Sequence, residues 1–226
     1  MDDGVRARAV AAGGNGDTVC IVTSDGTLIC TSQERGAFTS PPSGTFVDVV
    51  VRFGVACALG ADGAISCRGT PREGLAGRHE GPFIDVAASM FTGCGLHADG
   101  SVECWGDTSS LDSVRMAGPF TSVDGLCGRG ADGVVTCWKG ETHPIGTRAV
   151  RTFTAGSNRC GIDQSGSLAC APASYAEASP PSIGEGYLQV AAAERDATAC
   201  ALRVDGRVDC WGNARLGCFV PSHGFP

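Results

Sequence analysis

The sequence predicts an all-β repeat fold, a β-propeller of about six short blades with three or four strands each. Twelve of the thirteen cysteines form six pairs, and the members of every pair are ten residues apart. An Asp-Gly or Ser-Gly dipeptide stands near the middle of each pair between alternating apolar residues, which is the pattern of a tight β-hairpin. Glycine supplies 34 of 226 residues, about twice its usual share of roughly 7%, as a turn-rich chain requires. The pairs are Cys20 and Cys30, Cys57 and Cys67, Cys94 and Cys104, Cys127 and Cys137, Cys160 and Cys170, and Cys200 and Cys210.

The spacing of the cysteines also selects the register of each hairpin. In the second repeat a two-residue turn at Asp62 and Gly63 would place Cys57 and Cys67 on opposite faces of the hairpin. A three-residue loop at 61–63 instead pairs the two cysteines and puts Gly63 in the left-handed position of a glycine bulge. The same midpoint holds in all six repeats. We therefore expect the cysteines of each pair to face each other at a separation that a disulfide bridges.

Two interpretations of the paired cysteines stand side by side. Each pair either forms a disulfide across its hairpin, which contributes about 3 kcal/mol or less for a loop of this size, or remains reduced as two small buried apolar residues. The pairing in every repeat favours the disulfides. A zinc site is disfavoured, because such sites use cysteines two to four residues apart and this chain has no pair so close. Cys218 has no partner in the pattern; it is a free thiol, a link to another chain or a buried residue of the last linker, and we favour the buried residue.

A short apolar segment precedes each hairpin, and we interpret it as the innermost strand of its repeat. Segments of this kind lie at 10–12, 47–51, 84–88 and 190–193. The alanine-rich ones favour helix by propensity alone, but their shortness and the repeat context favour strand. After each hairpin a polar linker of about a dozen residues or more supplies either a fourth edge strand or only a loop.

The repeats are expected to form one domain over 1–226. Three-stranded units with two apolar faces must stack on one another, and radial closure protects their edges. An open β-solenoid is the structural alternative, and the ring has either six blades or more. The expected repeats cover approximately 5–45, 46–82, 83–119, 120–149, 150–186 and 187–226.

The third and sixth repeats resemble the repeat of the regulator of chromosome condensation family. The third repeat carries Cys94-Gly95-Leu96, Asp99-Gly100 and Cys104-Trp105-Gly106, and the sixth carries Cys200-Ala201-Leu202, Asp205-Gly206 and Cys210-Trp211-Gly212. The resemblance implies a β-propeller, usually of seven longer blades. The short repeats here are similar to a bacterial branch that includes a secreted propeller-type inhibitor of β-lactamases.

The tryptophan of the family pattern persists in three repeats, as Trp105, Trp138 and Trp211, and is replaced by Thr31, Arg68 and Ala171 in the other three. Because the tryptophans recur at one repeat position, we interpret them as packing elements between blades rather than as ligand platforms.

The charge of the chain argues against nucleic acid as a partner. The formal net charge is −7, the isoelectric point is about 5.0 and there is no basic run, whereas a nucleic-acid binder needs a basic face. No apolar stretch reaches membrane-spanning length. Residues 1–8 contain no apolar signal core, but thirteen cysteines favour an oxidising compartment. We expect an extracellular, periplasmic or cell-surface protein, with the cytoplasm as the alternative.

No catalytic motif is present, and we expect neither enzyme activity nor a cofactor or metal. The four histidines, at 79, 97, 143 and 223, have no common spacing, and no nucleophile elbow or zinc-protease motif occurs. A hydrolytic or glycan-binding propeller is the alternative, which carboxylates gathered in the central channel would support.

The loops between inner strands and hairpins are the expected partner-binding surface, because all of them emerge on one propeller face. Aromatic, methionine and arginine residues in such loops are typical of interfaces. In a second interpretation Phe53 and Phe91 turn inward and cap the channel. The function expected is a monomeric, non-enzymatic scaffold for a protein partner, and the resemblance to the bacterial branch implies inhibition as its narrower form. The intracellular alternative is regulation of a small GTPase by nucleotide exchange. The candidate binding residues are Arg52, Phe53, Met90, Phe91, Asn158, Arg159, Glu194 and Arg195.

Overall fold

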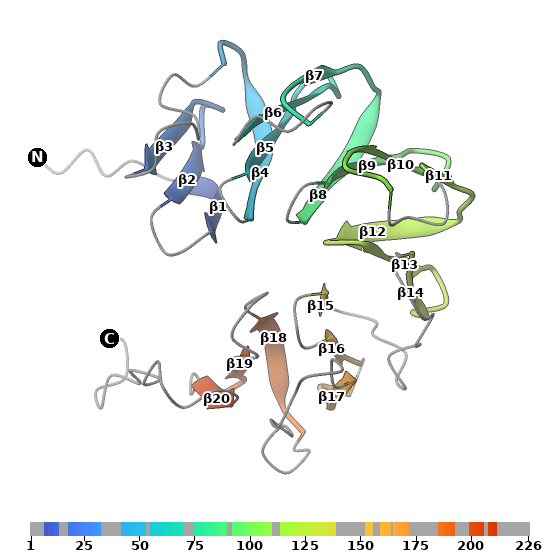
Figure 1. Ribbon diagram of the computed structural model, residues 1–226. Coiled ribbons are helices and arrows are strands. Elements are labelled where there is room, and N and C mark those ends of the chain that lie inside the picture. Colours follow the sequence, from blue (N-terminus) through green and yellow to red (C-terminus); the bar gives the residue numbers. More distant parts are fainter. Residues whose placement is uncertain are drawn as a thin grey trace, which may run out of the picture. The chain divides into compact units, whose positions relative to one another are not determined.

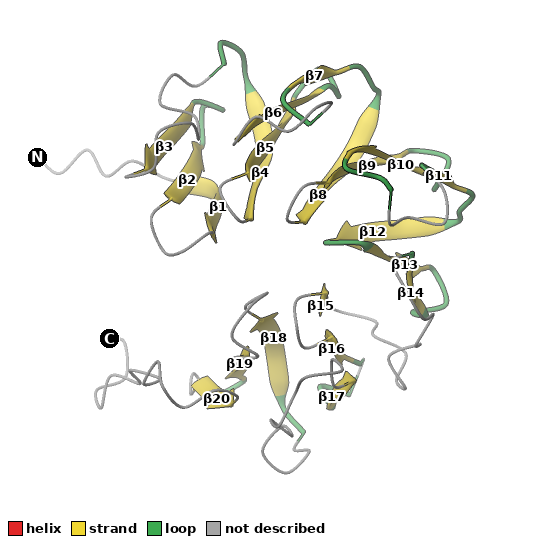
Figure 2. Cartoon of the chain, in the orientation of Figure 1, coloured by secondary structure: helices red, strands yellow, loops and turns green. Residues whose placement is uncertain are grey.

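A computed structural model describes the chain over thirteen ranges, in which strands are the regular elements (Figure 2). The ranges are 7–13, 18–32, 42–52, 55–69, 75–89, 92–109, 114–138, 152–155, 159–163, 165–171, 185–192, 199–205 and 208–211. The chain divides into two compact units, 1–126 with 138–140, and 127–137 with 141–226. A single domain over 1–226 stays a prediction.

The first unit contains three antiparallel sheets, which we call blades 1 to 3, and one further inner strand (Figure 1). Blade 1 has the order β1 (Ala7–Gly13), β2 (Thr18–Thr23), β3 (Leu28–Ser32). Blade 2 has the order β4 (Phe46–Arg52), β5 (Val55–Gly60), β6 (Ile65–Gly69), β7 (Gly77–His79). Blade 3 has the order β8 (Phe83–Ser89), β9 (Thr92–His97), β10 (Val102–Gly106), β11 (Arg115–Met116), and β12 (Phe120–Asp124) follows it.

The second unit contains two three-stranded sheets and one hairpin. The hairpin belongs to the fourth repeat and consists of β13 (Cys127–Gly130) and β14 (Val135–Cys137). We call the sheets of the fifth and sixth repeats blades 5 and 6. Blade 5 has the order β15 (Thr152–Ala155), β16 (Arg159–Ile162), β17 (Leu168–Ala171). Blade 6 has the order β18 (Tyr187–Ala192), β19 (Ala199–Arg203), β20 (Val208–Trp211). The alanine-rich segments are strands, as predicted, and the linkers supply a short fourth strand in blades 2 and 3.

The predicted hairpin register is confirmed in all six repeats. In blade 2 Cys57 pairs with Cys67 and Leu59 with Ile65, and the cysteines of the other five pairs also face each other. Gly63 has a φ of +81°, the left-handed conformation that only glycine adopts without strain. The same conformation recurs in the turns at Gly26, Gly100, Gly133 and Gly166.

Four of the described hairpin turns are also tied to the inner strand that follows them in the chain. The N–H groups of Phe46, Phe83 and Phe120 donate to the carbonyl oxygens of Gly26, Gly63 and Gly100, at 2.8, 2.8 and 2.9 Å. In the second unit the Tyr187 N–H donates to the Gly166 carbonyl at 3.0 Å. The turn glycine thus closes its own hairpin and fixes the start of the next blade.

The blades of the first unit stack by their faces. The inner strands β1, β4, β8 and β12 follow one another (Figure 1). A forward face, which carries the cysteine pair, packs against the receiving face of the next blade. From blade 1, Cys20, Val22 and Leu28 meet Phe46, Val49, Val51, Ala56 and Ala58 of blade 2. Burial of these apolar side chains is the main stabilising contribution.

Candidate functional site on the inner strands

A row of carboxylates runs along the inner strands of the first unit. Asp48 lies in β4, Asp85 in β8 and Asp124 at the end of β12. Because β4, β8 and β12 are successive neighbours, the repeat brings together residues that are 37 and 39 positions apart in the sequence. We call these three residues the inner-strand acidic row.

Asp85 links two neighbouring inner strands. Its Oδ1 accepts the backbone N–H of Val86 at 2.9 Å, and its Oδ2 accepts the N–H of Val123, in β12, at 3.0 Å. The pKa of Asp85 is raised to about 6: burial is the largest cause, the two backbone hydrogen bonds oppose it, and the charges of Asp48 and Asp124 add to it. Near neutral pH the group is therefore a buried carboxylate that joins two strands.

Asp48 occupies the corresponding place in the preceding blade. Its Oδ1 accepts the Val49 N–H at 2.8 Å. Burial raises the pKa of Asp48, whereas the hydrogen bond from Val49 and the charge of Arg8 lower it. Both carboxylates follow an aromatic residue and a β-bulge, between Phe46 and Asp48 in β4 and between Phe83 and Asp85 in β8. The bulge redirects the side chain that comes after it.

Arg52 and Asp124 form an ion pair between two inner strands. Arg52 is the last residue of β4, and its Nη2 lies 3.1 Å from Oδ1 of Asp124. About a quarter of each side chain is exposed, 26% and 24%. The guanidinium is therefore held in a fixed position at the end of the blade where the predicted binding loop begins, and it remains accessible to solvent.

The side chains of the other seven predicted binding residues lie outside the described part of the structure. Arg159 begins β16, in the second unit, and its side chain lies outside the described residues. Phe53, Met90, Phe91, Asn158, Glu194 and Arg195 also lie outside them. Of the eight predicted residues the structure thus places the side chain of Arg52, and it pairs that side chain with an acidic residue that the sequence analysis did not select.

The predicted disulfides are confirmed in four hairpins, Cys20–Cys30, Cys57–Cys67, Cys94–Cys104 and Cys127–Cys137. Their Cα–Cα separations are 4.0 to 4.1 Å. Cys160 is disulfide-bonded as well and lies opposite Cys170. Cys200 lies opposite Cys210, but the side chains of this last pair, like Cys218, are outside the described residues.

The tryptophans pack between blades, as predicted for Trp105 and Trp138. Trp105 of blade 3 packs against the cluster that contains Cys57 and Cys67 of blade 2. Trp138 is 3% exposed and packs with Cys94 and Cys104 of blade 3. The side chain of Trp211 lies outside the described residues.

His79 of blade 2 belongs to the contact between blades 2 and 3, and His97 lies beside Phe83 within blade 3. The His79 ring stacks on Trp105, with ring centroids 4.1 Å apart, and Phe83 lies between Trp105 and His97, at 5.8 and 4.5 Å. The His79 Nε2 lies 3.2 Å from the Leu75 carbonyl oxygen, so this nitrogen carries the proton. Burial lowers the pKa of His79. His143 and His223 are outside the described residues.

Sequence reasoning missed the aromatic residue that starts the inner strands and the acidic residue two positions later. Their signals were present, because Phe46, Phe83 and Phe120 are spaced by 37 residues, as are Asp48 and Asp85. A search for periodicity that includes residues other than cysteine and glycine finds both.

The described part of the chain has neither a metal-binding cluster nor a membrane-spanning helix. Its histidine, cysteine, aspartate and glutamate side chains form no group of three or more suited to holding a metal ion. No helix within the same ranges is long and apolar enough to cross a membrane.

Stacked antiparallel blades with a disulfide on the forward face define a β-propeller fold, which comparison with solved structures supports. The CRINKLY WD40 ectodomain of the Arabidopsis thaliana receptor kinase ACR4 matches with a TM-score of 0.72 and 19% identity, over 88% of this chain and 78% of that one. Human WBSCR16 matches with a TM-score of 0.67 and 11% identity, over 94% and 77%.

Yeast RCC1 itself is among the similar structures. Prp20p from Saccharomyces cerevisiae matches with a TM-score of 0.64 and 12% identity, over 90% of this chain and 71% of Prp20p. No protein-family model matches the sequence, and no curated protein matches it. At these identities the similarity establishes the fold.

Proposed function

We propose that the chain is a non-enzymatic propeller scaffold that binds a protein partner through the loops at the Arg52 end of its blades. The observation that carries this proposal is the Arg52–Asp124 pair, 3.1 Å apart and a quarter exposed. An arginine whose side chain is already held in place loses little conformational entropy on binding, and arginine is enriched at interface hot spots.

The disulfides support the same function. Each binding loop joins an inner strand to a hairpin, and in blades 1, 2 and 3 that hairpin is cross-linked. Because the hairpin is cross-linked, the strand to which each loop leads is held in place before a partner binds. Disulfides persist in oxidising compartments, which supports a location outside the cytosol, as does the similarity to a receptor ectodomain.

Similar structures support a protein as the partner. Prp20p was described together with its binding to Gsp1p and histones, and yeast RCC1 (Prp20) was also solved bound to Kap60. An inhibitory role toward an enzyme, which the resemblance to the propeller-type β-lactamase inhibitor implies, is the narrower form of the proposal.

We interpret the inner-strand acidic row as structural rather than catalytic. Both carboxylate oxygens of Asp85 accept backbone N–H groups, and Asp124 is paired with Arg52. A general acid or base must reach the proton that it transfers. Carboxylates that already hold neighbouring strands together fit a scaffold better than a hydrolytic or glycan-binding site.

An intracellular regulator of a small GTPase is the second candidate function. The fold similarity to yeast RCC1 favours it. The disulfides weigh against it, because cytosolic thiols are kept reduced.

The test is affinity capture by the oxidised full-length protein from two separate fractions, cytosolic and extracytoplasmic, with partners quantified by mass spectrometry. Arg52→Glu is compared with Arg78→Glu, a matched charge reversal at the opposite end of blade 2, where Arg78 pairs with Asp62 and Glu80. We expect an extracytoplasmic protein that binds wild type and Arg78→Glu equally and Arg52→Glu at least tenfold more weakly. A cytosolic partner selects the second candidate, and equal loss in both variants contradicts the proposed surface.

A further inference from the structure

The disulfides of the first unit differ in how the next blade covers them. In blades 2 and 3 a tryptophan that follows the second cysteine of the next hairpin packs on the cysteine face. Trp105 contacts the cluster with Cys57 and Cys67, and Trp138 the cluster with Cys94 and Cys104. These four cysteines are 0 to 5% exposed.

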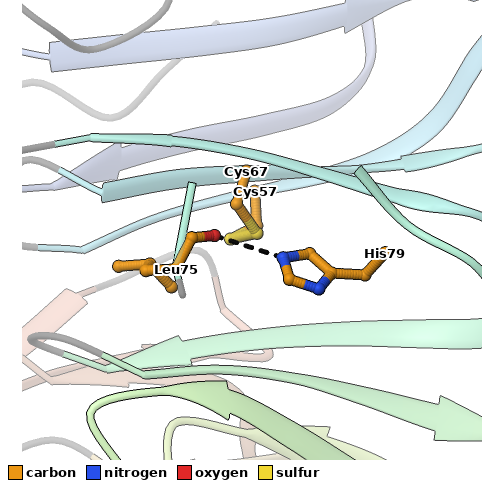
Figure 3. The surroundings of a disulfide bond; sticks show 4 residues. All are labelled: Cys57, Cys67, Leu75 and His79. Carbon is orange, nitrogen blue, oxygen red and sulfur yellow. Dashed lines mark hydrogen bonds between the residues drawn. A yellow bond between two sulfur atoms is a disulfide. The ribbon is translucent and has the colours of Figure 1, made fainter. Parts of the chain in front are cut away.

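Figure 3 shows two further residues beside Cys57–Cys67. Leu75, 1% exposed, and His79 lie beside the disulfide, and His79 bonds the Leu75 carbonyl oxygen. The His79 ring is also stacked against Trp105. A thiol in solution has no direct approach to either sulfur.

Cys20–Cys30, in blade 1, lacks the tryptophan. The equivalent position in blade 2 is Arg68, which lies opposite Ala56 as Trp105 lies opposite Gly93. The Arg68 side chain is exposed, and Cys30 is only partly buried. Every other cysteine whose burial the structure describes is at most 5% exposed. Blade 1 therefore carries the most accessible disulfide among the described residues.

We propose that Cys20–Cys30 is a redox modification site, the disulfide that a dithiol reductant opens while the protein stays folded. The thiolate of the reductant attacks Sγ of Cys30, the S–S bond breaks, and Cys20 leaves as a thiolate that takes up a proton. The second thiol of the reductant then attacks the mixed disulfide, releases Cys30 as a thiol and becomes a cyclic disulfide. Two electrons pass from the dithiol to the protein, and access to the attacked sulfur sets the order of reduction.

Reduction of this disulfide removes a covalent constraint within blade 1. The β2–β3 hairpin keeps its strand pairing from Thr18 with Ser32 to Val22 with Leu28, but it loses the covalent constraint. Blade 1 also has an apolar surface on its receiving face, the face opposite the cysteine pair. There Val10, Val19 and Ile29 are 69%, 39% and 44% exposed. Opening the disulfide therefore removes a constraint from blade 1, whose cysteine pair is not covered by a tryptophan of the next blade.

The experiment exposes the native full-length protein to dithiothreitol for increasing times, traps free thiols with iodoacetamide and maps the labelled peptides by mass spectrometry. We expect Cys20 and Cys30 to be labelled at least tenfold faster than Cys57, Cys67, Cys94 and Cys104. Another pair opening first, or all pairs opening together, overturns the proposal.

Substitutions at the tryptophan position test the cause. Arg68→Trp should slow labelling of Cys20 and Cys30 several-fold, whereas Arg68→Ala should leave it fast. Since Gly93 faces Trp105 in blade 3, Ala56→Gly with Arg68→Trp provides a second variant with more room for the ring. Trp105→Ala should accelerate opening of Cys57–Cys67. If neither Arg68→Trp nor the double variant Ala56→Gly with Arg68→Trp changes the rate at which Cys20 and Cys30 are labelled, the tryptophan is not what shields the other disulfides.

Discussion

The contact between blades 1 and 2 and the contact between blades 2 and 3 use the same repeat in two ways. Both place a cysteine face against the receiving face of the next blade. The receiving face of blade 2 contains Ala56, Ala58 and an exposed Arg68. The receiving face of blade 3 contains Gly93, Gly95 and Trp105 at the same positions. The forward faces are alike, so the difference arises on the receiving side.

The glycines of blade 3 explain how it accommodates more aromatic area. A Cβ added at Gly93 would lie 2.6 Å from Trp105 Nε1, and one added at Gly95 would overlap the Phe83 ring. The absence of a Cβ at Gly93 and Gly95 in β9 leaves room for two rings on the same face. The comparison teaches that the residues flanking the first cysteine, rather than the cysteines, decide how tightly a blade is covered.

Replacing Phe83 by Ala should have the largest effect on stability. Phe83 is 4% exposed and contacts His97 and Trp105, and its loss should cost about 3–5 kcal/mol of unfolding free energy. Phe46→Ala, at the same position of blade 2, should cost about 1 kcal/mol less, because Phe46 has no aromatic contact of this kind among the described residues. Urea unfolding measures both, and an equal or larger loss in Phe46→Ala breaks the comparison.

Asp85 should make stability depend on pH. Its pKa in the folded protein is raised from 3.8 to about 6, so its contribution to stability is fully present below pH 3.8 and is lost as the pH rises through 6. Relative to wild type, Asp85→Asn should therefore gain up to about 3 kcal/mol of unfolding free energy between pH 4 and pH 8.

The control for this prediction is Asp62→Asn. A hydrogen bond from Arg78 lowers the pKa of Asp62, so its contribution is present above pH 3.8 and is lost as the pH falls through the lowered value. Its pH dependence should have the opposite sign. The free energy of unfolding is measured by chemical denaturation at each pH. If it depends on pH in the same way in wild type and in Asp85→Asn, the raised pKa of Asp85 is refuted.

Gly95→Ala should destabilise the contact between blades 2 and 3 by about 1–3 kcal/mol, because the new methyl group meets the Phe83 ring. The matched change in blade 2, Ala58→Gly, removes a fully buried methyl group and should cost about 1 kcal/mol. Thermal unfolding of the two variants measures this, and a stabilised Gly95→Ala would show that β9 has spare room.

The Arg52–Asp124 pair should give the smallest effect. A double-mutant cycle with Arg52→Ala and Asp124→Ala should yield a coupling energy of about 1 kcal/mol or less, as expected for a partly exposed pair, and higher salt should reduce it. Zero coupling at low salt would mean that the pair does not fix the arginine and would weaken its role as a binding anchor.

Much of the local structure was predictable from the sequence. The ten-residue spacing of Cys57 and Cys67 and the central Gly63 predict the hairpin register, because side chains alternate along a strand with a period of two. The fourth strands β7 and β11 were left open, because segments of three and two residues carry no readable periodicity. Arg52 was selected as a loop residue, but its partner Asp124 was not, since the pair is 72 residues apart.

The sequence by itself determined the number of repeats, the turn conformation, the cysteine pairing and the strand character of the inner segments, since each depends on contacts within about twenty residues. The tertiary structure decided which face each blade presents to its neighbour, and with it the cover of each disulfide, the tie from Asp85 to β12 and the ion pair of Arg52. The physical reason is that stacking brings together residues from different repeats. Whether a sulfur or a carboxylate is buried there depends on the side chains of the next blade rather than on its own.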